Sequence, residues 1–254
     1  MGKIKLSEID TRAPKGWDKQ ETKDKLVSVL AELDELQNLL YAESKHALLV
    51  IIQGMDASGK DGTIRNVFGK LNPQGVLVKS FKTPTAEELS HDFLWRIHAN
   101  APAKGIIQLF NRSQYEDILI TRVHKLIDDE TAYNRMKAIN HFERLLTEHS
   151  THIHKFYLHI SREEQRQRLD ERIHNPAKQW KYNEDDYKEA KLWDDYMTMY
   201  EDCFRNCNEV PWTIIPADQN WYKEYLIATM VRDTLKGLNM QYPGLKKTDS
   251  RIIS

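Results

Sequence analysis

Cysteine, long apolar runs and an excess of charge of either sign are all scarce in this chain of 254 residues. The two cysteines, Cys203 and Cys207, are four residues apart on a helical pattern, a poor geometry for a disulfide. We expect two buried thiols in a reducing compartment. The longest apolar run covers only residues 47–52, far short of the ~20 residues that span a membrane. No apolar signal core follows Met1, so we expect a cytoplasmic protein with no membrane partner.

Charge is balanced over the whole chain. Lysine and arginine total 37, aspartate and glutamate total 38, and the formal net charge is -1. Without a strong overall field, the protein is not expected to attract nucleic acid, and any polyanion must be bound by a local cluster of cations.

One short glycine-rich stretch carries the clearest chemical signal. Residues 54–62 read Gly-Met-Asp-Ala-Ser-Gly-Lys-Asp-Gly, which fits the phosphate-binding pattern G-x-x-x-x-G-K except that Asp61 replaces the usual Ser or Thr. A buried apolar strand precedes the stretch and a helical pattern follows it, as a phosphate loop requires. Lys60 would then reach the transferred phosphoryl group. The alternative is a tight strand-to-helix turn that binds no ligand.

Alternating strand and helix patterns predict a single α/β domain over residues 1–254. We expect a three-layer, doubly wound parallel sheet of about five strands with helices on both faces. The expected strands are residues 46–53, 76–78, 105–110, 155–160 and 212–215. The expected helices are about 24–43, 63–68, 85–99, 114–126, 132–149, 162–174, 184–206 and 219–238. Within the domain, residues 1–20 form an N-terminal arm, about 162–190 a lid segment, and 239–254 a C-terminal tail.

A second cluster of polar residues follows the expected strand 105–110. Phosphate-loop kinases commonly place a Mg²⁺-binding Asp at this strand end, but here the position is Asn111. An amide oxygen is a weak ligand, so carboxylates close to the loop must balance the metal charge. We expect Asp56 to be the main ligand, with Asp61 and Asn111 as the other candidates.

The residues after Asn111 suggest phosphate contacts and the start of a helix. Arg112 is placed to grip a phosphate with its planar fork of donors. Ser113 and Glu116 have the spacing of a capping box, so Glu116 either caps the next helix or faces the substrate. Arg122 either faces the same cleft or is exposed to solvent.

The predicted lid is rich in arginine. Arg162 and Arg166 share one side of the helix 162–174, whereas Arg168 and Arg172 lie on another, so both rows cannot face one phosphate. The arginine row that does not face the phosphate is expected to be solvated or paired with acidic neighbours. A lid at this position would exclude water and bring cations to the transferred group. The alternative is a plain surface helix.

Four motifs taken together resemble the type-2 polyphosphate kinase family over about residues 10–235. They are Gly54-x-Asp56-x-x-Gly59-Lys60-x-Gly62, Phe110-Asn111-Arg112-Ser113-x-Tyr115-Glu116-Asp117, Ser161-x-x-Glu164-Gln165-x-x-Arg168 and Pro176-x-Lys178-x-Trp180-Lys181. The resemblance implies a thymidylate-kinase-like core of the P-loop kinase class with a helical lid, and Mg²⁺, or alternatively Mn²⁺, as cofactor. It also implies phosphoryl transfer between inorganic polyphosphate and nucleotides.

The resemblance also suggests a branch of the family and roles for individual residues. Many members carry Asp at the place of Asn111 and Asn at the place of Glu116, and the form found here looks like class III, which phosphorylates nucleoside mono- and diphosphates. The residues expected to be catalytic are Asp56, Lys60, Arg112, Glu116, Arg168 and Arg172. The residues expected to contact phosphate are Gly54, Met55, Ala57, Ser58, Gly59, Lys60, Asp61, Gly62, Arg65, Arg122, Lys178 and Lys181.

The function expected from these features is polyphosphate-driven phosphorylation of AMP to ADP and of ADP to ATP, with GMP and GDP as further acceptors. The long helix 24–43 and the resemblance favour a homo-oligomer, a dimer or a tetramer. One rival function is that of an ATP-dependent nucleoside monophosphate kinase. Two others lack catalysis: a silent nucleotide-binding regulator and a protein that binds polyphosphate without transferring phosphate.

Overall fold

Five parallel strands form the centre of the molecule. The computed structural model describes residues 4–245. The strands are β1 (Ala47–Gln53), β2 (Val76–Ser80), β3 (Ile107–Asn111), β4 (Thr151–His159) and β5 (Trp212–Pro216). Their order is β2-β3-β1-β4-β5, and every pairing is parallel. The predicted doubly wound α/β class is confirmed.

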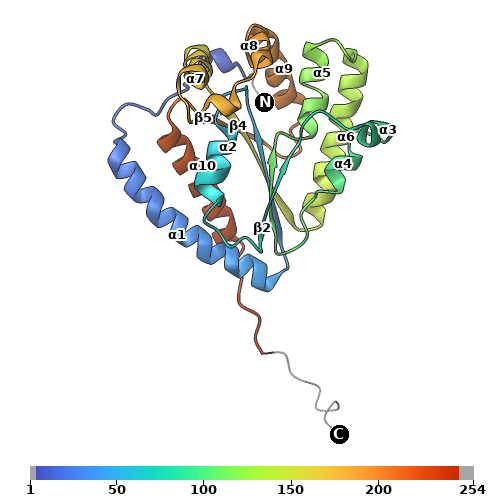
Figure 1. Ribbon diagram of the computed structural model, residues 1–254. Helices are drawn as coiled ribbons and strands as arrows, with labels where there is room; N and C mark the ends of the chain where they lie inside the picture. The colour runs from blue at the N-terminus through green and yellow to red at the C-terminus, as the bar shows by residue number, and fades with distance from the viewer. Residues whose placement is uncertain (1–3, 246–254) are drawn as a thin grey trace.

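Helices cover both faces of this sheet. Figure 1 shows α1 (Lys19–Glu43) and α10 (Asn220–Gly237) on one side and α6 (Asp129–Glu148) on the other. The helices α7 (Arg162–His174) and α8 (Glu184–Ala190) lie above the end of the sheet. The remaining helical elements are η1 (Leu6–Glu8), α2 (Lys60–Thr63), η2 (Ile64–Phe68), α3 (Ala86–Ser90), α4 (Trp95–His98), η3 (Gln114–Asp117), α5 (Ile120–Val123), η4 (Gln179–Lys181) and α9 (Trp193–Asn206).

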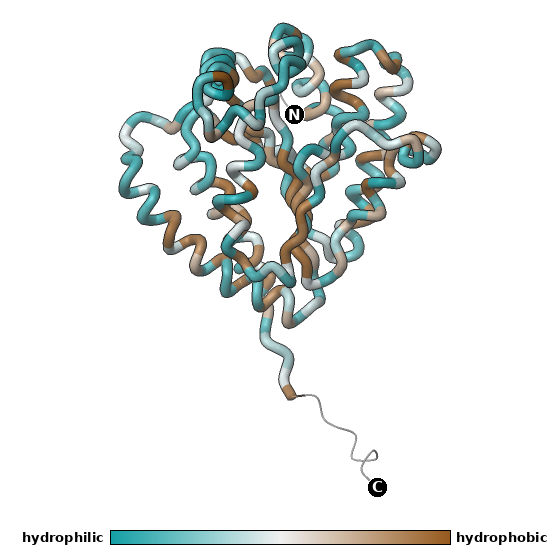
Figure 2. Tube along the Cα trace, viewed as in Figure 1, coloured by the Kyte–Doolittle hydropathy of each residue, from teal (hydrophilic) through white to brown (hydrophobic). Residues whose placement is uncertain are grey.

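Strand β1 lies in the middle of the sheet and is flanked by β3 and β4. All seven of its residues are buried, which explains why its sequence is apolar without alternation. Figure 2 shows the same pattern for the whole molecule, with hydrophobic residues gathered along the central strands. The loop that follows β1 is therefore anchored to a fully buried central strand.

Helix α1 packs along α10. The side chain of Asp18 caps its first turn by accepting from Glu21 N at 2.8 Å, and Leu33 and Leu40 are buried in the core. The long leading helix that the sequence predicts thus covers one face of the sheet. It begins at Lys19 rather than at about residue 24.

The described part of the N-terminal arm, residues 4–18, lies against the domain. Leu6 N donates to Glu201 at 2.8 Å, and Thr11 Oγ1 donates to Asp218 at 2.8 Å. At the other end, residues 239–245 form neither helix nor strand, and the rest of the predicted tail, 246–254, lies outside the described residues.

Three helices predicted as continuous are interrupted. The stretch 114–126 divides into η3 and α5, 184–206 divides into α8 and α9, and 85–99 divides into α3 and α4. In the third case Asp92 accepts from Leu94 N at 2.9 Å and so supports a turn between the helices. These continuous helices were wrong because periodicity does not report local side-chain bonds to the backbone.

A buried ion pair lies beneath η3. Lys155 on β4 donates to Glu143 on α6 at 2.8 Å and to Tyr115 at 2.8 Å, and Tyr115 donates to Glu143 at 2.5 Å. Burial raises the pKa of Glu143, and the charge of Lys155 opposes that rise. Because Tyr115 is anchored in this network, η3 turns inward instead of starting a regular helix.

Both cysteines lie in the interior of the domain. Cys203 and Cys207 are free and buried, as predicted. Among residues 4–245, no helix combines the length and the apolar character that crossing a bilayer requires.

The Glu143–Lys155 pair gives a test of the core. Replacing one partner leaves a buried charge unpaired, so Lys155→Met should lower the free energy of unfolding by about 3–5 kcal/mol, measured by urea denaturation. Removing the exposed pair Arg144–Glu209, with N···O at 2.6 Å, by Arg144→Ala should cost less than about 1 kcal/mol. Equal effects of the two substitutions would contradict this view of the core.

Candidate functional site

The glycine-rich stretch is a loop between β1 and α2. Gly54 and Gly59 have φ of +152° and +96°, and Ala57 also has a positive φ of +63°. A side chain at Gly54 is excluded because its Cβ would lie 2.8 Å from Ser58 Oγ and 2.9 Å from Leu158 O. The loop therefore needs Gly54 and Gly59 for conformation and for close packing.

Lys60 is the first residue of α2, and its side chain extends back across the loop. Its Nζ donates to Gly54 O at 2.7 Å and to Met55 O at 3.0 Å. Burial, reinforced by the nearby charge of Arg112, lowers the pKa of Lys60 to about 8. An anion bound in the loop would offset both effects, so the site is electrostatically prepared for phosphate.

Arg112 joins the second cluster to the loop. It follows β3 with a φ of +62°, a conformation that costs energy for a residue with a Cβ. Its Nη2 donates to Asp56 at 2.6 Å, and its Nη1 lies 3.5 Å from Glu116 Oε2. Although burial opposes the charged form, Glu116 and Asp56 raise the pKa of Arg112. The guanidinium is thus a permanent cation beside the loop.

Glu116 faces the site and does not form the predicted capping box. The Ser113 side chain accepts from Tyr115 N at 3.3 Å instead. With its amide oxygen turned toward Ser113, Gln53 donates to Glu116 Oε1 at 3.0 Å. Burial raises the pKa of Glu116, and Arg112 and Lys60 oppose that rise. The capping interpretation was wrong because Tyr115 is drawn into the core.

The candidate metal ligands lie in the loop after β1 (Asp56), in the first turn of α2 (Asp61) and at the end of β3 (Asn111). Asn111 Nδ2 donates to Asp61 Oδ1 at 2.8 Å, which leaves the amide oxygen of Asn111 as an acceptor. Asp56 contributes a second carboxylate. In residues 4–245, no group of three His, Cys, Asp or Glu side chains could hold a metal by itself. Two carboxylates and one amide oxygen fit a hard cation such as Mg²⁺, which takes its remaining ligands from phosphates and water.

Arg168 contacts the outer side of the loop. Its Nη1 donates to Ala57 O at 3.0 Å and to Ser58 O at 3.1 Å. Its Nη2 bonds the carbonyls of Ala217 and Asp218, and its Nε bonds Glu164. These five bonds use every N–H of the guanidinium. In this arrangement Arg168 positions the loop, and the catalytic role expected for it from the sequence stays a prediction.

Several other cations of the lid segment are paired with acidic residues. Arg172 bonds Asp186, and Lys178 bonds Glu171. Lys181 Nζ lies 3.2 Å from Asp61 Oδ2 and so connects the lid to the start of α2. Of the two arginine rows, the one with Arg168 and Arg172 faces inward, while Arg162 is exposed and pairs with Asp194.

Two residues expected to contact phosphate lie elsewhere. Arg122 bonds Asp202 at 2.7 Å and Asp129 at 2.9 Å, and so links α5 to α9 and to α6. Arg65 is exposed, and its Nε donates to the adjacent Asn66 Oδ1 at 3.3 Å. The structure does not bring either guanidinium to the loop, and their phosphate contacts stay predictions.

Three residues at the site were assigned no role from the sequence. Gln53 contacts Ser113 and Glu116, Gln165 donates to Asp56 O at 3.1 Å, and Lys223 is buried behind the loop. Gln165 could have been found because it lies on the same helical face as Arg168. Lys223 also left a signal, since a charged residue at that position interrupts the apolar stripe of α10.

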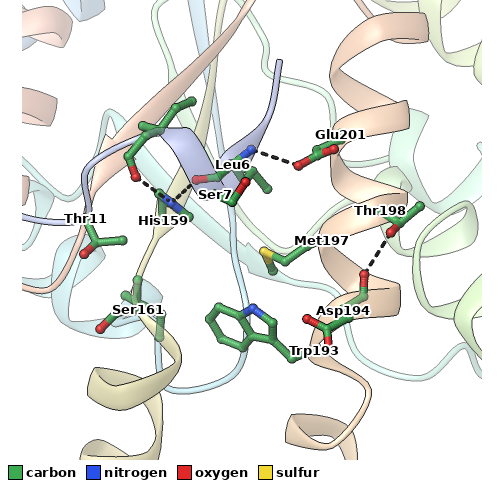
Figure 3. Close-up of a pocket in the computed structure, with 12 residues that line it drawn as sticks. Leu6, Ser7, Thr11, His159, Ser161, Trp193, Asp194, Met197, Thr198 and Glu201 are labelled. Carbon is green, nitrogen blue, oxygen red and sulfur yellow. Dashed lines mark hydrogen bonds between the residues drawn. The ribbon is translucent and has the colours of Figure 1, made fainter. Parts of the chain in front are cut away.

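A separate cavity of about 420 Å³ lies between the N-terminal arm and α9. Figure 3 shows His159 beneath the arm, and its Nε2 lies 3.1 Å from Leu6 O. Ser161, which caps the start of α7, and Trp193, which begins α9, also border it. The cavity thus adjoins both ends of the lid segment and contains none of the predicted site residues.

Comparisons with known proteins point to one family. The model of the family polyphosphate kinase 2 (PPK2) matches residues 4–243. The AMP/ADP-polyphosphate phosphotransferase of Meiothermus ruber is 46% identical over 246 residues, which are 96% of this chain and 92% of that protein. The ADP-polyphosphate phosphotransferase of Rhodopseudomonas palustris is 40% identical over 95% of this chain and 89% of its own length.

A solved structure gives the same result. The crystal structure of polyphosphate kinase 2 from Arthrobacter aurescens TC1 has a TM-score of 0.93 and 41% sequence identity to this chain. The match covers 96% of this chain and 89% of that one. The similarity therefore includes the sheet, the loop and the lid region together.

The geometry of the site predicts which cations bind a polyanion. A lost charge-assisted hydrogen bond costs about 1.5–3 kcal/mol, so Lys60→Ala and Arg112→Ala should each weaken tripolyphosphate binding by about 10-fold or more in calorimetry. Arg166→Ala is the matched control, because Arg166 is exposed on the far side of α7. Equal weakening by all three substitutions would show that binding is nonspecific.

Proposed function

This chain belongs to the polyphosphate kinase 2 family, and from that premise we propose that both AMP and ADP are its acceptors and Mg²⁺ is its cofactor. The enzyme moves phosphoryl groups between inorganic polyphosphate and nucleotides. GMP and GDP are further acceptors in this proposal. The observation that carries the choice of acceptors is the partly buried Glu116 beside Arg112, in a chain similar to an AMP/ADP phosphotransferase.

The reaction needs positioning and charge neutralisation more than covalent help. A terminal phosphate oxygen of the nucleotide forms a bond to the terminal phosphorus of polyphosphate, while the bond from that phosphorus to the bridging oxygen breaks. The nucleotide gains one phosphate and the polymer loses one. Lys60 and Arg112 stabilise the charge that develops, and the loop holds the donor in line with the acceptor.

Asp56, Asp61 and Asn111 are the residues proposed to hold Mg²⁺. A bound Mg²⁺ neutralises charge on the phosphates. Asp56 accepts from Arg112, and Asp61 accepts from Asn111 and Lys181. These pairings keep the carboxylates ordered and the oxygen-rich side of the site together, which supports the proposal.

The lid is proposed to close over the reacting groups through its existing contacts. Lys181 already reaches Asp61, and Arg172 is held by Asp186 and by Lys181 O at 3.3 Å. Closure would bring these two cations to the donor and exclude water. Arg168 is the fixed point about which the lid moves, because it stays bonded to the loop.

We also propose a homo-oligomer in the cytoplasm. Leu77 and Val78 on the edge strand β2 are 51% and 54% exposed, and Tyr41 of α1 is 42% exposed. Apolar side chains exposed at a sheet edge favour contact with another subunit. The free thiols of Cys203 and Cys207 fit a reducing compartment.

The proposed acceptors are tested with purified protein, Mg²⁺, polyphosphate and no ATP. AMP, ADP, GMP and GDP are supplied in parallel, and the products are separated by chromatography. We expect ADP and ATP from AMP, and ATP from ADP. No product from either adenine nucleotide would favour an ATP-dependent monophosphate kinase, and unchanged rates in Lys60→Ala and Arg112→Ala would favour a silent regulator.

The metal proposal predicts a specific effect of Asp56. Because one carboxylate ligand is lost, Asp56→Asn should raise the Mg²⁺ concentration that gives half-maximal activity by about 10-fold or more. Its thermal midpoint should stay near that of the wild type, since Asp56 is partly exposed. Full activity of the wild type in excess EDTA would contradict the metal requirement.

A further inference from the structure

Every carbonyl of the loop from residue 54 to residue 59 accepts a hydrogen bond. Lys60 covers Gly54 and Met55 from within the loop. The other carbonyls are bonded by Gln165, Arg168, Thr63 and Lys223. Ser58 N donates to Met55 O at 3.1 Å. The carbonyls from 54 to 59 engage no other backbone N–H group of residues 54–60, so those groups are left for an anion.

Lys223 is the least expected of these donors. It lies on α10, its side chain is fully buried, and it belongs to neither the loop nor the lid. Its Nζ lies 3.4 Å from Ser58 O and 3.5 Å from Gly59 O, and it donates to Asn220 Oδ1 at 2.9 Å. A buried ammonium is costly unless it has such partners. The hydrogen-bond acceptors around Lys223 therefore stabilise it in this position behind the loop.

The backbone at Gly59 fits this lysine closely. A Cβ at Gly59 would collide with Lys223 Nζ and would lie 3.4 Å from Arg168 Nη1. The positive φ of +96° already disfavours any other residue there. Lys223 and Arg168 therefore occupy the outer side of the loop at the residue just before Lys60.

We propose that Lys223 is a positioning residue for phosphoryl transfer, which fixes the outward carbonyls of Ser58 and Gly59 so that the loop N–H groups face the donor phosphate. The inference rests on the proposed function and deepens it. Arg168 does the same for Ala57 and Ser58 from α7, so two helices hold the loop from outside. Lys223 touches the loop backbone and acts through it.

Charged groups from each neighbouring element surround Lys223. Arg168 and Glu164 face it from α7, Lys60 from the start of α2, and Glu224 from its own helix. Burial, then the charge of Arg168, lowers the pKa of Lys223 to about 7. A phosphate in the loop would favour the protonated form, so the contribution of Lys223 should decline as the pH rises through this value.

The main test compares Lys223→Met with Lys236→Met, an exposed lysine of the same helix. Since a misplaced phosphate site costs up to about 100-fold, Lys223→Met should lower kcat/KM for polyphosphate by about 10-fold to 100-fold. KM for ADP should stay within about twofold, and Lys236→Met should match the wild type. The ratio of wild-type to Lys223→Met kcat/KM should shrink between pH 6 and pH 8.5.

Two further measurements keep the inference falsifiable. Asn220→Ala keeps the lysine but removes its orienting partner, so it should show a smaller loss in the same direction even if Lys223→Met does not fold. Calorimetry with tripolyphosphate should show weaker binding to Lys223→Met even if no phosphoryl transfer occurs in the wild type. The inference would be overturned if the folded variants had wild-type kinetics and wild-type tripolyphosphate binding. It would also be overturned if kcat/KM fell equally for polyphosphate and ADP and the fall did not vary with pH.

Discussion

The arrangement of the site depends on the hydrogen bonds that hold the carbonyl groups of the loop 54–59. Lys60 bonds the first two from inside, while Gln165 and Arg168 of α7 bond the next three from outside. A loop carbonyl without a hydrogen bond would be free to turn toward the phosphate and repel it. These bonds therefore keep the phosphate-facing side of the loop free for an anion. Because α7 also carries Arg172, the helix that holds the loop belongs to the proposed lid. In that proposal, loop geometry and lid position are coupled through α7.

Charge at the site is balanced by pairs that a substrate can rearrange. Asp56 binds Arg112, and Asp61 lies between Asn111 and Lys181. In the usual phosphate loop a hydroxyl follows the lysine and a carboxylate ends the neighbouring strand. Here the carboxylate follows the lysine and an amide ends the strand, and the two are in contact. The pair formed by Asp61 and Asn111 therefore carries one negative charge, as the usual pair does, but the carboxylate has moved from the strand end to the position after the lysine.

The sequence was sufficient for the sheet, the loop and the two clusters that meet there. The apolar run of β1 and the glycine pattern specify local structure strongly, and parallel strands bring their carboxyl ends to one edge. It was not sufficient for Arg168, because helical spacing separated two arginine rows without showing which faced inward. The capping prediction for Glu116 failed because the bond between Tyr115 and Glu143 links residues 28 positions apart. Lys223 was missed for a similar reason: its partners are distant backbone carbonyls.

The central claim is that side chains behind the loop turn its N–H groups toward the phosphate. A crystal structure of the protein with tripolyphosphate and Mg²⁺ tests this most directly. The account predicts phosphate oxygens within hydrogen-bond distance of loop N–H groups, with Arg168 and Lys223 still bonded to the carbonyls of Ala57, Ser58 and Gly59. A phosphate contacted by Arg168 itself, with those carbonyls released, would contradict the account.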